Sequence, residues 1–163
     1  MTTDVNQFLK RLVRNGDPNR IDTKGRTGLV LASWYNWAQT VNQLLTKGAN
    51  TEIKTNSGIT ALFAASRRGN VVAVKLLLAK AADTEATNPA RITPLMQASF
   101  HGHVQIVDAL LQKGAIVDAT DRKQRTALMY ASHNGHTDVV ELLLANGAKP
   151  RAKDDGDNTA VNY

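Results

Sequence analysis

The sequence predicts an all-α solenoid, built from stacked helix-turn-helix units that are joined by hairpin-like turns. Three observations support this fold class: a period of 33 residues, apolar spacing typical of two short helices per unit, and turn residues between those helices. The repeat is clearest in a threonine that recurs without slippage at Thr27, Thr60, Thr93, Thr126 and Thr159. A unit of this length cannot bury its apolar stripe alone, so neighbouring units are expected to stack.

The N-terminal segment, residues 1–15, predicts one amphipathic helix. Its apolar residues follow helical spacing: Val5, Phe8, Leu9, Leu12 and Val13. Aligned through Gly16 and Gly48, this helix matches the second helix of a unit whose first half is missing. Its outer residues Lys10, Arg11 and Arg14 could suggest a membrane-surface helix. Capping the first full unit explains the helix better, because a solenoid needs a solubilising end.

The first helix of each full unit begins after the recurring threonine, whose side-chain oxygen can accept a hydrogen bond from a free helix amide. Leucine and alanine three residues apart, as in Leu95 and Ala98, then share one helix face. We expect the helix to end at a residue that tolerates a left-handed backbone. These residues are Asn36, Gly69, Gly102 and Gly135.

The second helix carries valine and two leucines at helical spacing, as in Val107, Leu110 and Leu111. A glycine that can form the left-handed C-terminal cap follows it in three units, at Gly48, Gly114 and Gly147. In the remaining unit Ala81 takes this place, which would cost on the order of 1 kcal/mol if the left-handed geometry is kept.

These elements divide the chain into four full repeats with a partial repeat at each end. The predicted boundaries are 1–21 for the N-terminal cap, 22–54, 55–87, 88–120 and 121–153 for the full repeats, and 154–163 for the last partial repeat. The final segment opens a fifth unit and stops inside its first helix. It is either a natural cap or the start of a trimmed unit, and we favour the second interpretation.

The residues of the third and fourth units match a known pattern. Thr93-Pro94-Leu95 at the first helix, Gly102-His103 at the break and residues 110–115 (Leu-Leu-Gln-Lys-Gly-Ala) closely resemble the ankyrin repeat, as does the segment 126–148. The resemblance extends over residues 16–163. The resemblance implies an ankyrin-repeat solenoid. The sequence departs from the family pattern in the first repeat, where Asn36-Trp37 replaces Gly-His.

Composition restricts the class of protein without naming a partner. The net charge of +6 and the isoelectric point near 9.8 favour a negatively charged partner, which is nucleic acid, anionic lipid or an acidic protein. An ordinary basic surface is the alternative. No apolar run reaches the roughly 18 residues that a membrane span needs. The absence of cysteine fits a reducing compartment, and we expect a monomeric cytoplasmic protein, with the nucleus or delivery into a host cell left open.

The sequence predicts no enzyme, no cofactor and no metal. The resemblance implies a structural role for His103 and His136, which follow the glycines at the helix break. His101 and His133 could face the same groove, but no carboxylate is placed to complete a metal site. The sequence also lacks a phosphate-binding loop and a nucleophile–base pair.

Ankyrin repeats, by resemblance, bind partners on a concave face formed by turn tips and the ends of first helices. Mapping that face onto this sequence gives 14 residues, which we call the predicted partner surface. They are Lys24, Arg26, Trp34, Tyr35, Ile59, Arg67, Arg68, Ile92, Phe100, His101, Arg122, Arg125, His133 and Asn134. Its large apolar residues are expected to face solvent, and aromatic and arginine side chains are typical of binding hot spots.

The leading hypothesis is a non-catalytic module that binds an acidic protein or peptide with a few apolar anchors. Arginines of the surface would pair with carboxylates, while Trp34, Tyr35 and Phe100 would contact apolar side chains. A charge-driven binder of nucleic acid or anionic lipid is the alternative, although no base-recognition motif is visible. A structural spacer within a larger protein also stays open.

Overall fold

The computed structural model describes the backbone of residues 2–163 and the side chains of residues 4–163. Helices account for all the regular structure in this part of the chain, apart from one isolated bridge between Ile21 and Thr27. The chain divides into two compact units, residues 1–83 and residues 84–163. The prediction of an all-α repeat fold is confirmed.

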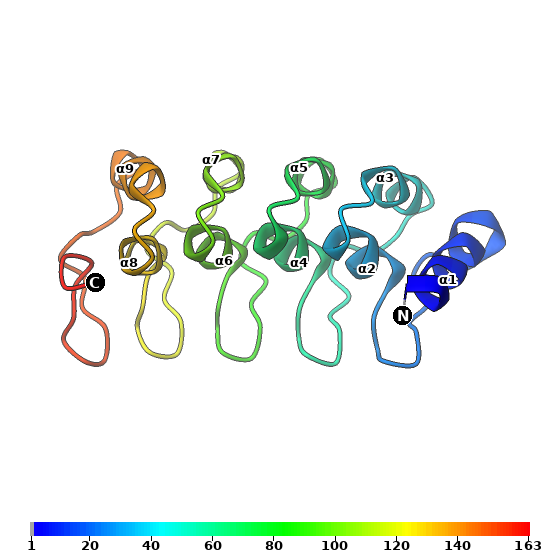
Figure 1. Ribbon diagram of the computed structural model, residues 1–163, viewed down its shortest axis with the longest axis horizontal. Coiled ribbons are helices and arrows are strands. Elements are labelled where there is room, and N and C mark those ends of the chain that lie inside the picture. The colour runs from blue at the N-terminus through cyan, green and yellow to red at the C-terminus, as the bar shows by residue number, and fades with distance from the viewer. Residues whose placement is uncertain (1) are drawn as a thin grey trace. The chain divides into compact units, whose positions relative to one another are not determined.

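In the first unit, inner helices that begin after the hairpins alternate with outer helices. The helices are α1 (Thr2–Asn15), α2 (Gly28–Trp34), α3 (Ala38–Thr46), α4 (Ala61–Arg68) and α5 (Val71–Ala79). The inner helices α2 and α4 lie side by side, as do the outer helices α3 and α5 (Figure 1). The N-terminal helix α1 packs against both α2 and α3.

The second unit repeats this arrangement. Its helices are α6 (Pro94–Phe100), α7 (Val104–Gln112), α8 (Ala127–His133) and α9 (Thr137–Ala145). The inner helix α6 contacts α8, and the outer helix α7 contacts α9 (Figure 1). Each inner helix packs against the outer helix that follows it, so the apolar stripes of the two helices meet in one core.

The recurring threonines cap the inner helices, as the sequence predicts. The hydroxyl oxygen of each accepts a hydrogen bond from the backbone amide three residues later, at 3.1–3.4 Å in the four full repeats. All four threonines are 2–3 % exposed, so each cap satisfies a helix amide that water cannot reach.

The predicted left-handed residues also adopt the expected backbone. The dihedral angle φ is +60° at Asn36 and +69° to +74° at the three glycines that occupy the same repeat position. After the outer helices, φ is +82° to +86° at the glycine caps and +56° at Ala81. Ala81 therefore keeps the left-handed geometry of a glycine cap while carrying a Cβ atom, so the cost expected for that case applies.

The N-terminal helix is attached through a position that differs from the other repeats. Leu12 of α1 is 2 % exposed and packs on Gly28, where the equivalent residues are Ala61, Pro94 and Ala127. A Cβ atom at Gly28 would come within 2.5 Å of Leu12 Cδ1 and 3.0 Å of Leu9 Cδ2. The missing Cβ therefore lets α1 lie directly against the first inner helix, which agrees with its predicted capping role.

The outer-helix leucines are not equally buried. Leu45 and Leu78 are 5 % and 6 % exposed, but Leu144 at the same repeat position is 42 % exposed. The buried stripe of the outer helices therefore does not include Leu144. The outer helices α3 and α5 cover one another, whereas the described residues that follow α9 form turns and contribute no further outer helix.

A row of side-chain acceptors connects neighbouring repeats within each unit. Asn19 and Glu52 accept hydrogen bonds from the backbone amides of Asn50 and Asp83, at 2.7 Å and 3.0 Å. In the second unit Glu85 and Asp118 accept from Ile116 and Lys149, each at 3.0 Å. Each amide lies 31 residues after its acceptor, so these bonds fix the loop that follows every outer helix to the preceding repeat.

Candidate partner-binding surface

The end of the first inner helix places Trp34 against two arginines of the next inner helix. The guanidinium carbons of Arg67 and Arg68 lie 5.6 Å and 5.2 Å from the centroid of the Trp34 ring. Both distances fall within the range of a cation–π interaction. Because α2 and α4 lie side by side, consecutive residues at the end of α4 can both approach one ring. The three residues form an aromatic–cationic cluster whose two arginines are exposed.

A hollow of about 330 Å³ adjoins this cluster. Its apolar wall is formed by Val30, Leu31, Trp34 and Ile59. Its polar wall is formed by residues of the first hairpin (residues 21–27) and of the next one (residues 55–59). Lys24 and Arg26 line its cationic side. The volume is at the lower end of the range of ligand pockets, which is enough for one or two side chains of a partner.

A second hollow, of about 450 Å³, lies between α1 and the first hairpin. Its apolar lining includes Phe8 of α1 and Ile21, which is 54 % exposed. Lys24, Arg26 and Tyr35 line both hollows. The first hairpin and the end of α2 therefore form a ridge between the two hollows, of which the first is mainly apolar and the second mixes apolar and charged residues.

The two cations of this ridge differ in their pairing. Arg26 donates to the carboxylate of Asp22 through Nε at 2.8 Å, and its Nη2 lies 2.7 Å from the same oxygen. Burial alone would raise the pKa of Asp22, but the hydrogen bonds from Arg26 and Lys24 and the charge of Arg26 outweigh it and lower that pKa. Lys24 is exposed, and only its backbone amide bonds to Asp22. The positive charge of Lys24 is therefore less neutralised than that of Arg26, which is paired with Asp22.

The predicted apolar residues are less exposed than the sequence suggests. Tyr35 and Phe100 are 41 % and 38 % exposed, as expected for a solvent-facing surface. Trp34, Ile59 and Ile92 are half-buried rather than exposed, so the expectation that they face solvent freely is wrong. Trp34 is covered by the two arginines, and Ile59 forms part of the wall of the first hollow.

Phe100 and the histidines of the third repeat form an aromatic group in the second unit. The Phe100 ring makes edge contacts with His101 and Tyr130, at centroid distances of 4.9 Å and 6.0 Å. His101 also stacks on His103 at 5.8 Å. Nε2 of His136 lies 3.0 Å from the carbonyl oxygen of Phe100. This bond agrees with the structural role that the resemblance implies for His136.

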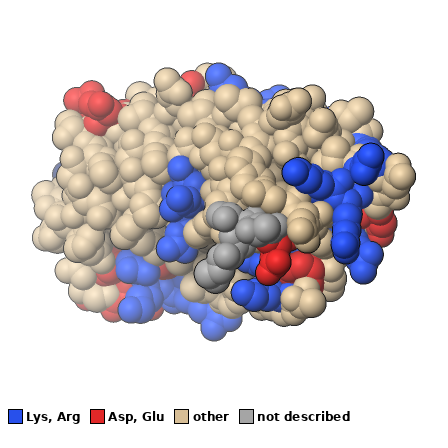
Figure 2. All heavy atoms as spheres, turned by 45° about the vertical axis from the view of Figure 1, so that its right-hand side comes forward, with Lys and Arg blue, Asp and Glu red and all other residues tan. Residues whose placement is uncertain are grey.

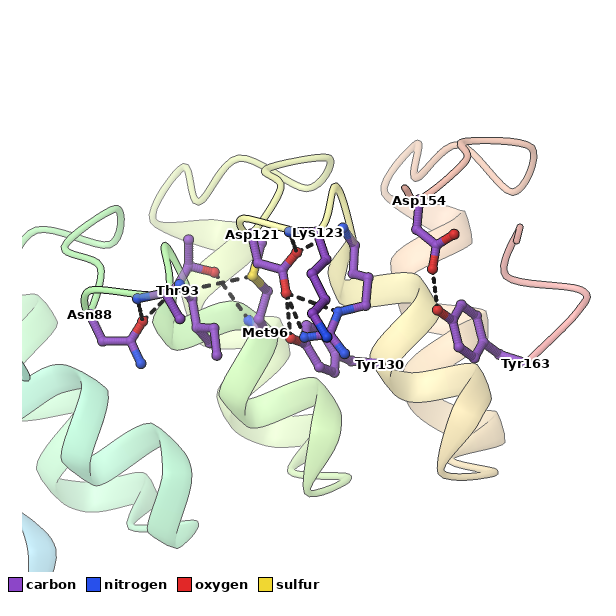
Figure 3. Close-up of polar contacts among 11 residues, drawn as sticks. Asn88, Thr93, Met96, Asp121, Lys123, Tyr130, Asp154 and Tyr163 are labelled. Atoms are coloured by element: carbon purple, nitrogen blue, oxygen red, sulfur yellow. Dashed lines mark hydrogen bonds and ion pairs between the residues drawn. The ribbon is translucent and has the colours of Figure 1, made fainter. Parts of the chain in front are cut away.

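Arg125 is held inside its own repeat. Its Nε and Nη2 donate to Asp121 Oδ2 at 2.9 Å and 2.8 Å, and its guanidinium carbon lies 4.8 Å from the Tyr130 ring centroid. Asp121 and Tyr130 point toward one another (Figure 3). Burial opposes ionisation of Asp121, but hydrogen bonds from Arg125, Tyr130 and Lys123 outweigh it and lower the pKa of Asp121. Much of the Arg125 charge is therefore neutralised within the fold.

The remaining predicted residues of the second unit have separate surroundings. Arg122 is exposed on the hairpin, and its backbone amide donates to the carbonyl of Ala90 at 3.1 Å. His133 makes an edge contact with Tyr163 at 5.4 Å. Asn134 donates to the carbonyl of Tyr130 at 2.8 Å. His101 and His133 thus have different ring partners, and the described residues contain no group of three or more His, Asp or Glu that could hold a metal ion.

Positive charge is concentrated in the first unit. Residues 1–83 carry 12 Lys and Arg against five Asp and Glu, a net charge of +7, whereas residues 84–163 carry eight against nine, a net charge of −1. Figure 2 brings the N-terminal end forward and shows Lys and Arg gathered there, with some acidic side chains among them. An attraction for acidic partners would therefore act mainly through the first unit.

Two further residues have structural roles that the repeat pattern does not predict. Asn70 is 6 % exposed and donates through Nδ2 to the carbonyl oxygen of Ser33 at 2.5 Å. It occupies the repeat position of His136, and its Nδ2 also donates to the carbonyl oxygen of Trp34 at 3.4 Å, which is the equivalent of the bond between His136 and Phe100. At this position the first repeat has Trp37, which stacks on Tyr35 at 5.3 Å. Tyr130 is the other such residue, and only its recurrence at Tyr163, 33 residues later, could have drawn attention to it.

No helix in the described part of the chain combines the length and apolarity that crossing a membrane requires. No curated protein matches the sequence. A family model described as ankyrin repeats, in three copies, matches residues 3–88 and again residues 73–154. Together the two matches include most of the chain, and each contains the helix pairs and capped turns described above. The chain belongs to the ankyrin-repeat family.

Proposed function

We propose that this chain is a non-catalytic interaction module that binds a protein or peptide through the predicted partner surface. Ankyrin repeats are in general protein–protein interaction modules. The partner is acidic overall and carries a few apolar anchors. The observation that carries this proposal is the cluster of Trp34, Arg67 and Arg68, which lies beside an apolar hollow in the unit with a net charge of +7.

The chemistry of the cluster supports a protein partner. Arginine binds carboxylates through two parallel hydrogen bonds, and a guanidinium group packed on an aromatic ring keeps its outward edge available for such bonds. Arg68 is exposed, and the Trp34 ring limits the freedom of its side chain. Less conformational entropy is then lost when a carboxylate binds, so the cluster is suited to a binding hot spot.

The test is a selection of short random peptides from a displayed library against the full chain. We expect the selected peptides to be acidic with apolar residues, and Arg67→Glu/Arg68→Glu to weaken their binding by about tenfold or more. The matched control is Lys75→Glu/Lys80→Glu, which makes the same charge change on exposed residues of α5 and its C-terminal cap. Equal loss in both variants, or failure to select any peptide, would refute the proposal.

A charge-driven polyanion binder is the second candidate, and the concentration of positive charge in the first unit favours it. Nonspecific binding of a polyanion depends on total charge and falls steeply with salt. Titration with heparin and with duplex DNA at two salt concentrations distinguishes the candidates. For a polyanion binder, both double variants lose affinity to a similar extent. For a peptide binder, the loss is confined to the Arg67/Arg68 variant.

A further inference from the structure

The two hollows of the first unit lie on either side of one shared ridge. Lys24, Arg26 and Tyr35 line both of them, so a bound segment that crosses the ridge can reach both hollows. Lys24 and Tyr35 are exposed, and Arg26 is partly exposed. The ridge thus presents a cation and an aromatic ring between a mainly apolar hollow and a second hollow that combines apolar and charged residues.

Each hollow combines an apolar wall with an excess of positive charge. The first hollow is lined by the cations Lys24 and Arg26 and has no acidic lining residue. The second is lined by these two cations together with Arg11 and Arg20. Its acidic lining residues are Asp4 and Asp22, of which Asp22 is paired with Arg26. Four cations against two acids give the second hollow a net charge of +2.

We propose that the ridge and its two hollows form a bipartite peptide site for an acidic segment with a carboxylate between two apolar side chains. The carboxylate pairs with Lys24 on the ridge. One apolar side chain enters the hollow beside Trp34 and Ile59, and the other enters the hollow beside Phe8 and Ile21. This proposal rests on the proposed function and names the sequence pattern that its partner carries.

The lining of the hollows favours a peptide over a nucleic acid. Recognition of single-stranded bases relies on aromatic faces that are open for stacking. The Trp34 ring already faces two guanidinium groups, and the Tyr35 ring stacks on Trp37 at an interplanar angle of 26°. The first hollow also has an aliphatic part to its wall, formed by Val30, Leu31 and Ile59. Aliphatic walls of this kind match leucine or phenylalanine side chains.

The experiment uses the selected peptides and three variants of the full chain. Lys24→Glu reverses the charge of the ridge, Ser57→Phe fills the first hollow, and Ile21→Asp removes the apolar edge of the second. All three residues are exposed, so we expect folded proteins, which thermal unfolding verifies. Lys75→Glu, at an exposed residue of α5, serves as the control for the charge reversal. Ile21→Ala replaces Ile21→Asp if the latter does not fold.

We expect selected peptides to carry an acidic residue between two apolar ones, and each variant to weaken binding by at least about tenfold. Replacing either apolar peptide residue with alanine should abolish the effect of the variant in the corresponding hollow. If binding responds to Arg67→Glu/Arg68→Glu but to none of the three variants, the bipartite site is refuted and the proposed function stands. If no peptide is selected, or if heparin binds as well and with the same response, both are refuted.

Discussion

The phenol of Tyr130 donates a 2.7 Å hydrogen bond to Oδ2 of Asp121, the carboxylate oxygen that also accepts from Arg125. Asp121 is 2 % exposed, so these donors replace the water that its charge would otherwise bind. The next hairpin repeats the contact, because the hydroxyl of Tyr163 donates to Oδ2 of Asp154 (Figure 3). There the hydrogen bonds from Tyr163, Asn158 and Gly156 outweigh the small effect of burial and lower the pKa of Asp154 to about 2.

Replacing Tyr130 with phenylalanine removes one donor from the buried carboxylate of Asp121. We expect Tyr130→Phe to lower the free energy of unfolding by about 1–2 kcal/mol at neutral pH, since a charged acceptor loses a hydrogen bond but keeps Arg125. Urea denaturation followed by circular dichroism measures the change. Tyr163→Phe is the control, and because its contact is exposed we expect less than about 0.5 kcal/mol. Equal effects of the two substitutions would contradict this account.

The same phenol predicts a loss of stability in alkaline solution. Burial, the hydrogen bond to Asp121 and the charge of Asp121 raise the pKa of Tyr130 above its ordinary value of 10. The stabilising contribution is therefore complete below pH 10, where the phenol is protonated in both states, and is lost as the pH rises toward the folded-state pKa. We expect the free energy of unfolding to fall above pH 10 more steeply in the native chain than in Tyr130→Phe. Parallel pH profiles would show that Tyr130 does not cause the loss.

The left-handed backbone at Ala81 predicts a stabilising substitution. A left-handed alanine costs about 1–2 kcal/mol, and glycine at this position avoids that cost. Part of the resulting gain in stability is offset, because glycine loses more backbone entropy on folding. We therefore expect Ala81→Gly to raise the free energy of unfolding by about 0.5–1 kcal/mol, measured by urea denaturation. Ala79→Gly, inside the last turn of α5, should instead lower it by a similar amount. A destabilising Ala81→Gly would show that its backbone is not strained.

Much of the fold could be predicted because the sequence repeats the local signals that determine it. The threonine caps and the left-handed residue after each inner helix depend only on residues that are close in the sequence, so residue type and spacing predict them. Alignment of four repeats then identifies Ala81 as an exception. The exposure of Leu144 was not predictable from its repeat position, because burial depends on which helix lies beside it.

The candidate site could be predicted only in part. Repeat position identified Trp34, Arg67 and Arg68 as surface residues, and the structure brings all three together. The sequence did not reveal that Arg26 and Arg125 are paired, because an aspartate four residues earlier meets the arginine only when the intervening hairpin folds back. The hollows depend on the positions of side chains from separate helices and turns, which a periodic pattern does not specify.

Three buried serines at one repeat position predict another gain in stability. The hydroxyls of Ser33, Ser66 and Ser99 are fully buried and have no hydrogen-bond partner among the described residues. We expect Ser66→Ala to raise the free energy of unfolding by about 0.5–2 kcal/mol, because a desolvated hydroxyl is removed and alanine favours a helix. Thr60→Ala in the same helix should lower it by about 1 kcal/mol through loss of the cap. Thermal unfolding of both variants checks the two signs, and a destabilised Ser66→Ala would imply that the hydroxyl is bonded.

The side-chain hydrogen-bond acceptors that link neighbouring repeats predict a local change in hydrogen exchange that can be distinguished from a change in global stability. Glu52 accepts from the amide of Asp83 at 3.0 Å and holds the loop after α5 against the preceding repeat. Because the bond is exposed, we expect Glu52→Ala to cost only about 0.5–1.5 kcal/mol. Hydrogen exchange should nevertheless be faster at the Asp83 amide, while the amides within α4 are affected only through global unfolding. Glu141→Ala, at an exposed glutamate of α9, is the control and should change neither quantity. Unchanged exchange at Asp83 in Glu52→Ala would show that the side chain does not hold this loop in place.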